Sequence, residues 1–355
     1  MQGARLTRAP APAANRAVTH PLSVAPMMDR TDRHFRVLAR ALSRRVLLYS
    51  EMIHAHAVIR GNRAQLLDFH LMERPLVLQL GGDDPQHLAE AARIGADHGY
   101  DEINLNCGCP SEKVQQGNFG VVLMADAERV ARCVAAMRDA VAVPVSVKHR
   151  IGFDDRDGFA DMLAFVDVVA EAGCDRFTVH ARKAWTQGLS PKQNREVPPL
   201  RHDEVHRLKQ ERPHLRIETN GGIRDVASAR AQLVYVDGVM IGRAAWDDPW
   251  LLASVDSALY GETSDPCLRR SDAVRALLPV IERRLSAGGR LGPIVRPLLN
   301  LFVGRPGGRR FRQTLSEGHH LPGADVGLLH EALQHVAAGE DAADGRLMVS
   351  AGASA

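Results

Sequence analysis

Short runs of apolar and β-branched residues recur along most of the chain. Each is about as long as a β-strand, and most break into polar residues or glycine at their C-terminal ends. Continuous apolar runs are typical of strands buried on both faces, as in a parallel sheet. The predicted strands are Ser23–Met27, Val46–Met52, Pro75–Gly82, Glu102–Cys109, Val143–Ile151, Arg176–Ala181, Arg216–Gly222 and Tyr235–Gly242.

Helical patterns separate most of these runs. Apolar residues recur at helical spacing in Pro85–His98, and Asp83 and Asp84 precede it as possible caps. Similar spacing predicts helices over Asp126–Val141, Phe159–Ala172 and Asp225–Leu233, and a less regular pattern predicts one over Ala57–Arg74. Alternation of eight strands with helices predicts a closed (β/α)8 TIM barrel rather than a doubly wound sheet.

A second, all-helical region follows the predicted barrel. The barrel is expected over residues 21–260, where a polar break at Gly261–Pro266 ends it. Helical spacing returns over Ala273–Leu285, Gly292–Phe302 and Val326–Ala338, which predicts a small α-helical domain over residues 261–340. Residues 1–20 and 341–355 are expected to be disordered tails, although the acid-poor, basic composition of the first also suits a targeting peptide.

Composition narrows the class of protein only a little. The 355 residues carry a net charge of +3 and are 45% apolar, as in ordinary globular proteins. No apolar run approaches the length of a membrane span, and the five cysteines are too irregularly spaced for a zinc site or a disulfide framework. We therefore expect a cytoplasmic, monomeric protein that binds neither membrane nor metal.

The C-terminal ends of the predicted strands carry most of the candidate chemistry. A TIM barrel places its active site at these ends. Nearly every one of them is polar, charged or glycine-rich, and this coincidence indicates an enzyme. In chain order they are Pro26 and Met27, Glu51, Gln79 with Gly81 and Gly82, Asn104 with Asn106 and Cys109, Lys148 with Arg150, His180 with Arg182, Asn220 to Gly222, and Gly242 with Arg243.

The last two strands end in segments suited to a phosphate group. Asn220-Gly221-Gly222 and Gly242-Arg243 each follow an apolar run and precede a helix. Glycine lets backbone N–H groups approach phosphate oxygens, and the N-terminus of the next helix favours an anion. Ordinary strand-to-helix turns are the alternative, but both loops carry the pattern together.

Three other strand ends present reactive side chains. Lys148 would form a Schiff base, stabilise an electron-rich cofactor ring, or simply reach solvent. His180 would bind a phosphate or cofactor, or be structural. Pro110 ends the fourth strand, so Cys109 is expected on a loop at the barrel mouth. A free thiol is mostly protonated at neutral pH, so Cys109 is a candidate general acid or nucleophile, whereas Cys107 is interpreted as packing.

Several of these motifs resemble those of the tRNA-dihydrouridine synthases. Ser23–Met27 with Thr31–Arg33, and Asn104–Ser111 with Gly117–Gly120, resemble signatures of that family. The segments His180–Trp185, Leu189–Glu196 and Gly304–Arg309 resemble the subgroup that modifies uridines 20 and 20a of the D loop. The likeness extends over about residues 21–317, and Arg30, Cys107 and Val121-Val122 depart from the usual pattern.

This resemblance implies FMN as prosthetic group, NADPH as electron donor and tRNA as substrate. A hydride would pass from flavin N5 to C6 of the uracil, and Cys109, at the family's proton-donor position, would protonate C5 from the opposite side. The uridine would first leave the base stack. By position, the implied FMN contacts are Pro26, Met27, Gln79, Lys148, His180, Asn220, Gly221, Gly222, Gly242 and Arg243. The implied tRNA contacts are Asn106, Lys192, Arg195, Arg309 and Arg312.

The charge distribution independently favours an RNA partner. Eight arginines and one acid lie between Ile281 and Leu315, which suits contacts with phosphates, although a solvated surface is the alternative. Three other functions stay open at this stage. They are a flavin barrel that reduces a small pyrimidine or enone, an RNA-binding module that has lost catalysis, and a Schiff-base aldolase that uses Lys148.

Overall fold

The computed structural model describes the backbone of residues 20–352 and the side chains of residues 20–340. Apart from His20, the tail predicted over residues 1–20 therefore lies outside the described residues. Nine parallel strands form one sheet in the order β1-β9-β8-β7-β6-β5-β4-β2, with β3 also paired to β4. The strands are β1 Leu22–Val24, β2 Leu48–Tyr49, β3 Ile53–His54, β4 Leu76–Gly81, β5 Glu102–Cys107, β6 Val145–Arg150, β7 Arg176–His180, β8 Arg216–Asn220 and β9 Gly238–Ile241.

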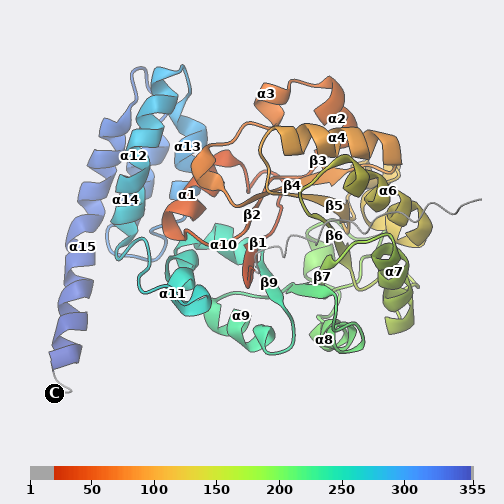
Figure 1. Ribbon diagram of the computed structural model, residues 1–355. Coiled ribbons are helices and arrows are strands. Elements are labelled where there is room, and N and C mark those ends of the chain that lie inside the picture. Colours follow the sequence, from red (N-terminus) through yellow and green to blue (C-terminus); the bar gives the residue numbers. More distant parts are fainter. Residues whose placement is uncertain (1–19, 353–355) are drawn as a thin grey trace, which may run out of the picture.

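The sheet closes between its first two strands. The backbone N–H of Val24 donates to Leu47 O at 2.9 Å, and that of Leu47 donates to Leu22 O at 3.1 Å. With β1 also paired to β9, the strands form the predicted TIM barrel, which Figure 1 shows inside its ring of helices.

The second predicted strand, Val46–Met52, is replaced by two short strands that both pair with β4. The strand β2 lies within the predicted range, and β3 begins just after it. Ser50 lies between them, and its hydroxyl accepts the backbone N–H of Gln79 at 3.0 Å. A side chain thus takes the place of a backbone partner and interrupts the ladder. This division explains why eight strand positions contain nine strands.

Helices cover the outside of the barrel. In the barrel they are α1 Arg33–Leu42, α2 Ala55–Arg60, α3 Arg63–Leu66, η1 Leu71–Glu73, α4 Pro85–Asp97, α5 Glu112–Gln116, η2 Gly120–Ala125, α6 Ala127–Ala140, α7 Phe159–Glu171, η3 Gln193–Arg195, α8 His202–Glu211, α9 Val226–Leu233, α10 Arg243–Asp247, η4 Pro249–Ser254 and α11 Val255–Tyr260. Among them, α4, α6, α7 and α9 lie close to their predicted positions, whereas α1 and α8 were not predicted.

The single helix predicted over Ala57–Arg74 is wrong, because α2, α3 and η1 occupy this segment. Helix α2 ends at Arg60, with Gly61 as its C-cap. Asn62 is the N-cap of α3, and its side chain accepts the backbone N–H of Gln65. Asparagine favours such caps over helix interiors, so the chain breaks here.

Four further helices lie on one side of the barrel, as Figure 1 shows. They are α12 Arg270–Ser286, α13 Leu291–Leu298, α14 Gly308–Gly318 and α15 Val326–Gly352. Helices α12 and α13 pack against α1, α15 packs against α12, and α14 packs against α15. The predicted helix Val326–Ala338 thus continues to Gly352 through most of the segment expected to be a tail, and residues 353–355 lie outside the described residues. No helix in the described part of the chain is both long and apolar enough to cross a membrane.

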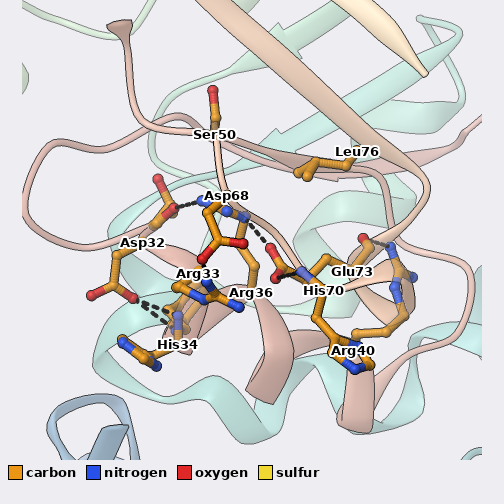
Figure 2. A network of polar contacts seen from close by, with 12 residues as sticks. Asp32, Arg33, His34, Arg36, Arg40, Ser50, Asp68, His70, Glu73 and Leu76 are labelled. Carbon is orange, nitrogen blue, oxygen red and sulfur yellow. Dashed lines mark hydrogen bonds and ion pairs between the residues drawn. The ribbon is translucent and has the colours of Figure 1, made fainter. Parts of the chain in front are cut away.

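A network of charged side chains holds α1 against its neighbours (Figure 2). The buried Arg36 donates from Nε to Glu73 Oε2 at 2.7 Å, and Glu73 also accepts the backbone N–H of His70. Asp68 pairs with Arg33 on α1 and, at 3.5 Å, with Arg284 on α12. Ion pairs therefore connect the barrel to the C-terminal helices.

The interior of the barrel is apolar on one side and polar on the other. Ala25, Leu47, Tyr49, Val77 and Met240 form a small buried apolar cluster separate from the main core between strands and helices. On β4 to β8 the buried inward positions are instead largely polar. They include Gln79, Glu102, Asn104, Asn106, Ser146, Thr178 and Glu218.

Candidate active site

The loop that carries Cys109 is held from three directions. Asn106 Oδ1 accepts the backbone N–H groups of Gly108 and Cys109 at 3.1 and 3.0 Å. Arg150 Nε donates to Gly108 O at 2.9 Å, and the N–H of Val121 donates to Cys109 O at 3.0 Å. Cys109 is the partly exposed cysteine of the chain, whereas the other four are buried. A thiol accessible at the barrel mouth is therefore fixed on a well-defined backbone.

Arg150 also connects this loop to the long loop after β7. Its Nη1 donates to the carbonyl oxygens of Lys183 at 3.0 Å and Asn194 at 3.1 Å. Burial lowers the pKa of Arg150 to about 10, so the guanidinium remains charged at neutral pH. The sequence placed Arg150 at a strand end but assigned it no contact.

Asn194 fixes the middle of the long loop and was not among the predicted site residues. It is fully buried, and its side chain accepts the N–H of Trp185 at 2.7 Å and donates to Trp185 O at 2.9 Å. Gln115 then connects the two loops, because its Nε2 donates to Pro110 O and Thr186 O at 2.8 and 3.0 Å. The motif match around Asn194 was the available sequence signal.

The glycine-rich end of β8 leaves no room for side chains. Gly221 and Gly222 have φ angles of +115° and +70°, a region that favours glycine. A Cβ atom on Gly221 would lie 2.8 Å from Cδ2 of His180. Asn220 Nδ2 donates to Met240 O at 2.7 Å and so joins β8 to β9. Side chains are therefore excluded at Gly221 by His180, and phosphate binding at this strand end stays a prediction.

Cations surround the buried ring of His180. Burial, followed by the charges of Arg150, Lys148, Arg182 and Arg195, holds the pKa of His180 well below its ordinary value, so the ring is neutral at pH 7. Burial also lowers the pKa of Lys148 to about 8. The Nε atoms of Arg182 and Arg195 are buried and have no hydrogen-bond partner among the described residues. Excess positive charge and unpaired donors suit an anionic ligand here.

The predicted FMN contacts lie on, or shortly after, six strands of the barrel: β1, β4, β6, β7, β8 and β9. Lys148 Nζ lies 3.4 Å from Asn220 Oδ1, and a Cβ atom on Gly242 would lie 3.8 Å from Sδ of Met27. Arg243 is tied to the loop after β7, because it pairs with Glu196 at 2.6 Å.

The predicted tRNA contacts do not form one cluster. Lys192 and Arg195 belong to the loop after β7, whereas Arg309 and Arg312 are exposed on α14 in the C-terminal helical region. Asn106 is 8% exposed, and its side chain is engaged within the protein. Its tRNA contact stays a prediction, and the structure shows in addition that it supports the Cys109 loop.

Comparison with known proteins gives a consistent result. The family model described as dihydrouridine synthase matches residues 23–338. A tRNA-dihydrouridine(20/20a) synthase of Synechocystis sp. is 56% identical over 315 residues, or 89% of this chain and 94% of the relative. The proteins with the same name in Xanthomonas campestris pv. campestris and Escherichia coli O6:H1 are 54% and 50% identical, over 88% and 89% of this chain and 92% and 95% of their own lengths.

Proposed function

The chain belongs to the dihydrouridine synthase family, and from this premise we propose that it reduces uridines 20 and 20a of the tRNA D loop to 5,6-dihydrouridine. The observation that carries the proposal is the pairing of two features at one barrel mouth. A partly exposed thiol, Cys109, lies on a clamped loop. The carbonyl of Gly108 in that loop binds Arg150, whose charge also acts on His180 at the electropositive, glycine-lined strand ends.

We propose that these strand ends around His180 bind FMN, with NADPH as the electron donor. The backbone of Gly221 and Gly222 can approach a phosphate closely, and Lys148 and Arg243 bring positive charge to the same mouth. When bound, the flavin would supply the hydride for C6 of the uracil. His180 is neutral at pH 7 and would act by hydrogen bonding rather than by charge. The other residues proposed to hold the group are Pro26, Met27, Gln79, Asn220 and Gly242.

Cys109 is proposed to protonate C5 of the uracil. Asn106 and Arg150 hold the peptide group that precedes Cys109, and the N–H of Val121 holds the carbonyl that follows, so the thiol is presented from a fixed position. A uridine in a folded tRNA is stacked, so the base must be flipped into the mouth to reach this thiol.

The tRNA is proposed to extend from the mouth to the C-terminal helices. Arg309, Arg310 and Arg312 are exposed on α14 and would contact phosphates. Lys192 and Arg195, on the loop after β7, would act nearer the target nucleotide.

Purified protein tests this proposal directly. It is expected to carry flavin and, with NADPH, to form dihydrouridine in an unmodified tRNA transcript. Nuclease digestion and mass spectrometry should place the product at positions 20 and 20a. A transcript with cytidine at both positions is the matched control. Absence of product from the first transcript, or equal turnover of free uridine, would overturn the assignment in favour of another function or a smaller substrate.

A further inference from the structure

A row of five hydrogen-bonded side chains runs through the barrel from its interior to the Cys109 loop. Ser146 Oγ donates to Glu102 Oε1 and accepts Asn104 Nδ2 at 2.8 Å. Asn104 Oδ1 accepts Gln79 Nε2 at 2.8 Å, and Gln79 Oε1 accepts Asn106 Nδ2 at 2.9 Å. All five side chains are buried. We call this row the amide relay.

Both ends of the amide relay fix the direction of its hydrogen bonds. At the inner end, Arg176 pairs with Glu102, so the ionised Glu102 carboxylate accepts a hydrogen bond from the Ser146 hydroxyl. At the outer end, two backbone N–H groups, those of Gly108 and Cys109, require an oxygen acceptor. Reversing any amide in between would place donor against donor or oxygen against oxygen. The three amides therefore have one orientation that satisfies every neighbour.

An asparagine cannot keep such an orientation alone. The terminal torsion of an amide side chain is soft, so its hydrogen-bond partners decide which way it points. On the side away from the loop, the amide nitrogen of Asn106 has one side-chain hydrogen-bond partner, Gln79. The acceptor that holds Cys109 therefore depends on residues deeper in the barrel.

We propose that the amide relay is a positioning device for Cys109. In this account Ser146 and Asn104 orient Gln79, Gln79 orients Asn106, and Asn106 fixes the backbone of Gly108 and Cys109. Ser146 and Asn104 thus affect the thiol without contacting it. The consequence for proton donation rests on the proposed function, whereas the claim about loop geometry does not.

Two measurements on the flavin-bound protein without tRNA test the geometry. Hydrogen exchange reports on the N–H groups of Gly108 and Cys109, and alkylation by iodoacetamide reports on the Cys109 thiol, because the other cysteines are buried. Ser146→Ala is expected to speed exchange of these two amides about tenfold, since it leaves a buried amide without an acceptor. It should also change the alkylation rate.

Thr178→Val is the matched control. Its hydroxyl is equally buried in the barrel interior and also donates to a carboxylate, that of Glu218, but it lies outside the amide relay. This variant should exchange and alkylate like the wild type. Ser146→Thr restores a hydroxyl and should return both rates toward wild type. Equal behaviour of Ser146→Ala and Thr178→Val would overturn the proposal.

A second variant keeps the test decisive if Ser146→Ala does not fold. Asn104→Ala interrupts the amide relay one step nearer the loop and should also release the two amides. In tRNA assays, either folded variant should lower kcat while leaving KM for tRNA unchanged. If exchange accelerates but the wild type forms no dihydrouridine, the proposed function fails and the positioning device stands. If exchange is unchanged and the wild type is active, the positioning device fails and the proposed function stands.

Discussion

Lys148 is a charged side chain whose burial lowers the stability of the folded protein. Its ammonium lies 3.4 Å from Asn220 Oδ1, and burial, reinforced by the charge of Arg150, lowers its pKa to about 8. We expect Lys148→Met to stabilise the flavin-free protein near neutral pH and to weaken its retention of FMN. Such an exchange of stability for function is common at binding sites.

The size of this effect follows from the pKa. Lowering it from 10.5 to about 8 corresponds to roughly 3 kcal/mol against the charged form. Because the side chain is only partly buried and solvent screens its charge, we expect about 1–2 kcal/mol in practice. Below about pH 8 the folded and unfolded chains both carry the charge, and the cost is fully present. As the pH rises from 8 towards 10.5, the folded state loses the proton first, and the cost disappears.

Urea denaturation of the two flavin-free proteins near pH 7 and pH 10 measures this cost. In the difference in unfolding free energy between variant and wild type, the contributions of the other titrating groups cancel. The advantage of Lys148→Met should be largest near pH 7 and shrink by about 1–2 kcal/mol near pH 10. Lys113→Met, at an exposed position, is the control and should show no such trend. A destabilised Lys148→Met protein, or a gap that does not change with pH, would refute the reasoning.

Three further predictions concern the glycine-rich end of β8, the RNA surface and the interface at α1. Gly221→Ala should lower flavin content at least tenfold, whereas Gly261→Ala, also at positive φ but with open space around it, should retain flavin. Equal losses of flavin in the two variants would exclude a specific role for Gly221. Arg309→Ala and Arg312→Ala should each weaken tRNA binding. Each should also reduce the slope of log affinity against the logarithm of the salt concentration by about 0.7–0.9. An unchanged slope would show that the substituted arginine does not contact tRNA. Glu73→Gln should cost roughly 3 kcal/mol in urea denaturation, because it leaves a buried arginine unpaired, and a loss below about 1 kcal/mol would contradict that role.

The architecture of the barrel follows from the sequence because its strands are short apolar runs separated by helices. Two predictions failed where a side chain replaced a backbone partner. Ser50 divides the second strand, and Asn62 interrupts the helix predicted over Ala57–Arg74. Such hydrogen bonds depend on local geometry that hydrophobic spacing does not reveal.

Helices α1, α8 and α14 were not predicted, and burial explains why. In α1 the buried face includes Arg36 and Arg40, whose guanidinium groups bind Glu73 and several backbone carbonyls. Charged residues on a buried face break the apolar stripe on which the prediction relies. Helix α8 buries only Val205 and Leu208, so its pattern is mostly polar.

The candidate site divides in the same way. The glycine, lysine and cysteine residues at strand ends could be found in the sequence because they follow apolar runs. The barrel fold then predicts that such ends lie at one mouth. The contacts of Arg150 and the amide relay were not visible, because their partners lie on different strands and depend on register. Asn106 shows the difference. Its position at a strand end was predicted, but its hydrogen bonds to the Cys109 loop and to Gln79 on β4 were not.

Product formation by Cys109→Ala tests the central claim most directly. The variant protein should retain FMN and bind tRNA with wild-type affinity. In a single turnover of the NADPH-reduced enzyme with unmodified tRNA, dihydrouridine formation should be at least about a hundredfold slower, the scale of a lost general acid. A rate equal to that of the wild type, with flavin and tRNA bound, would contradict the account.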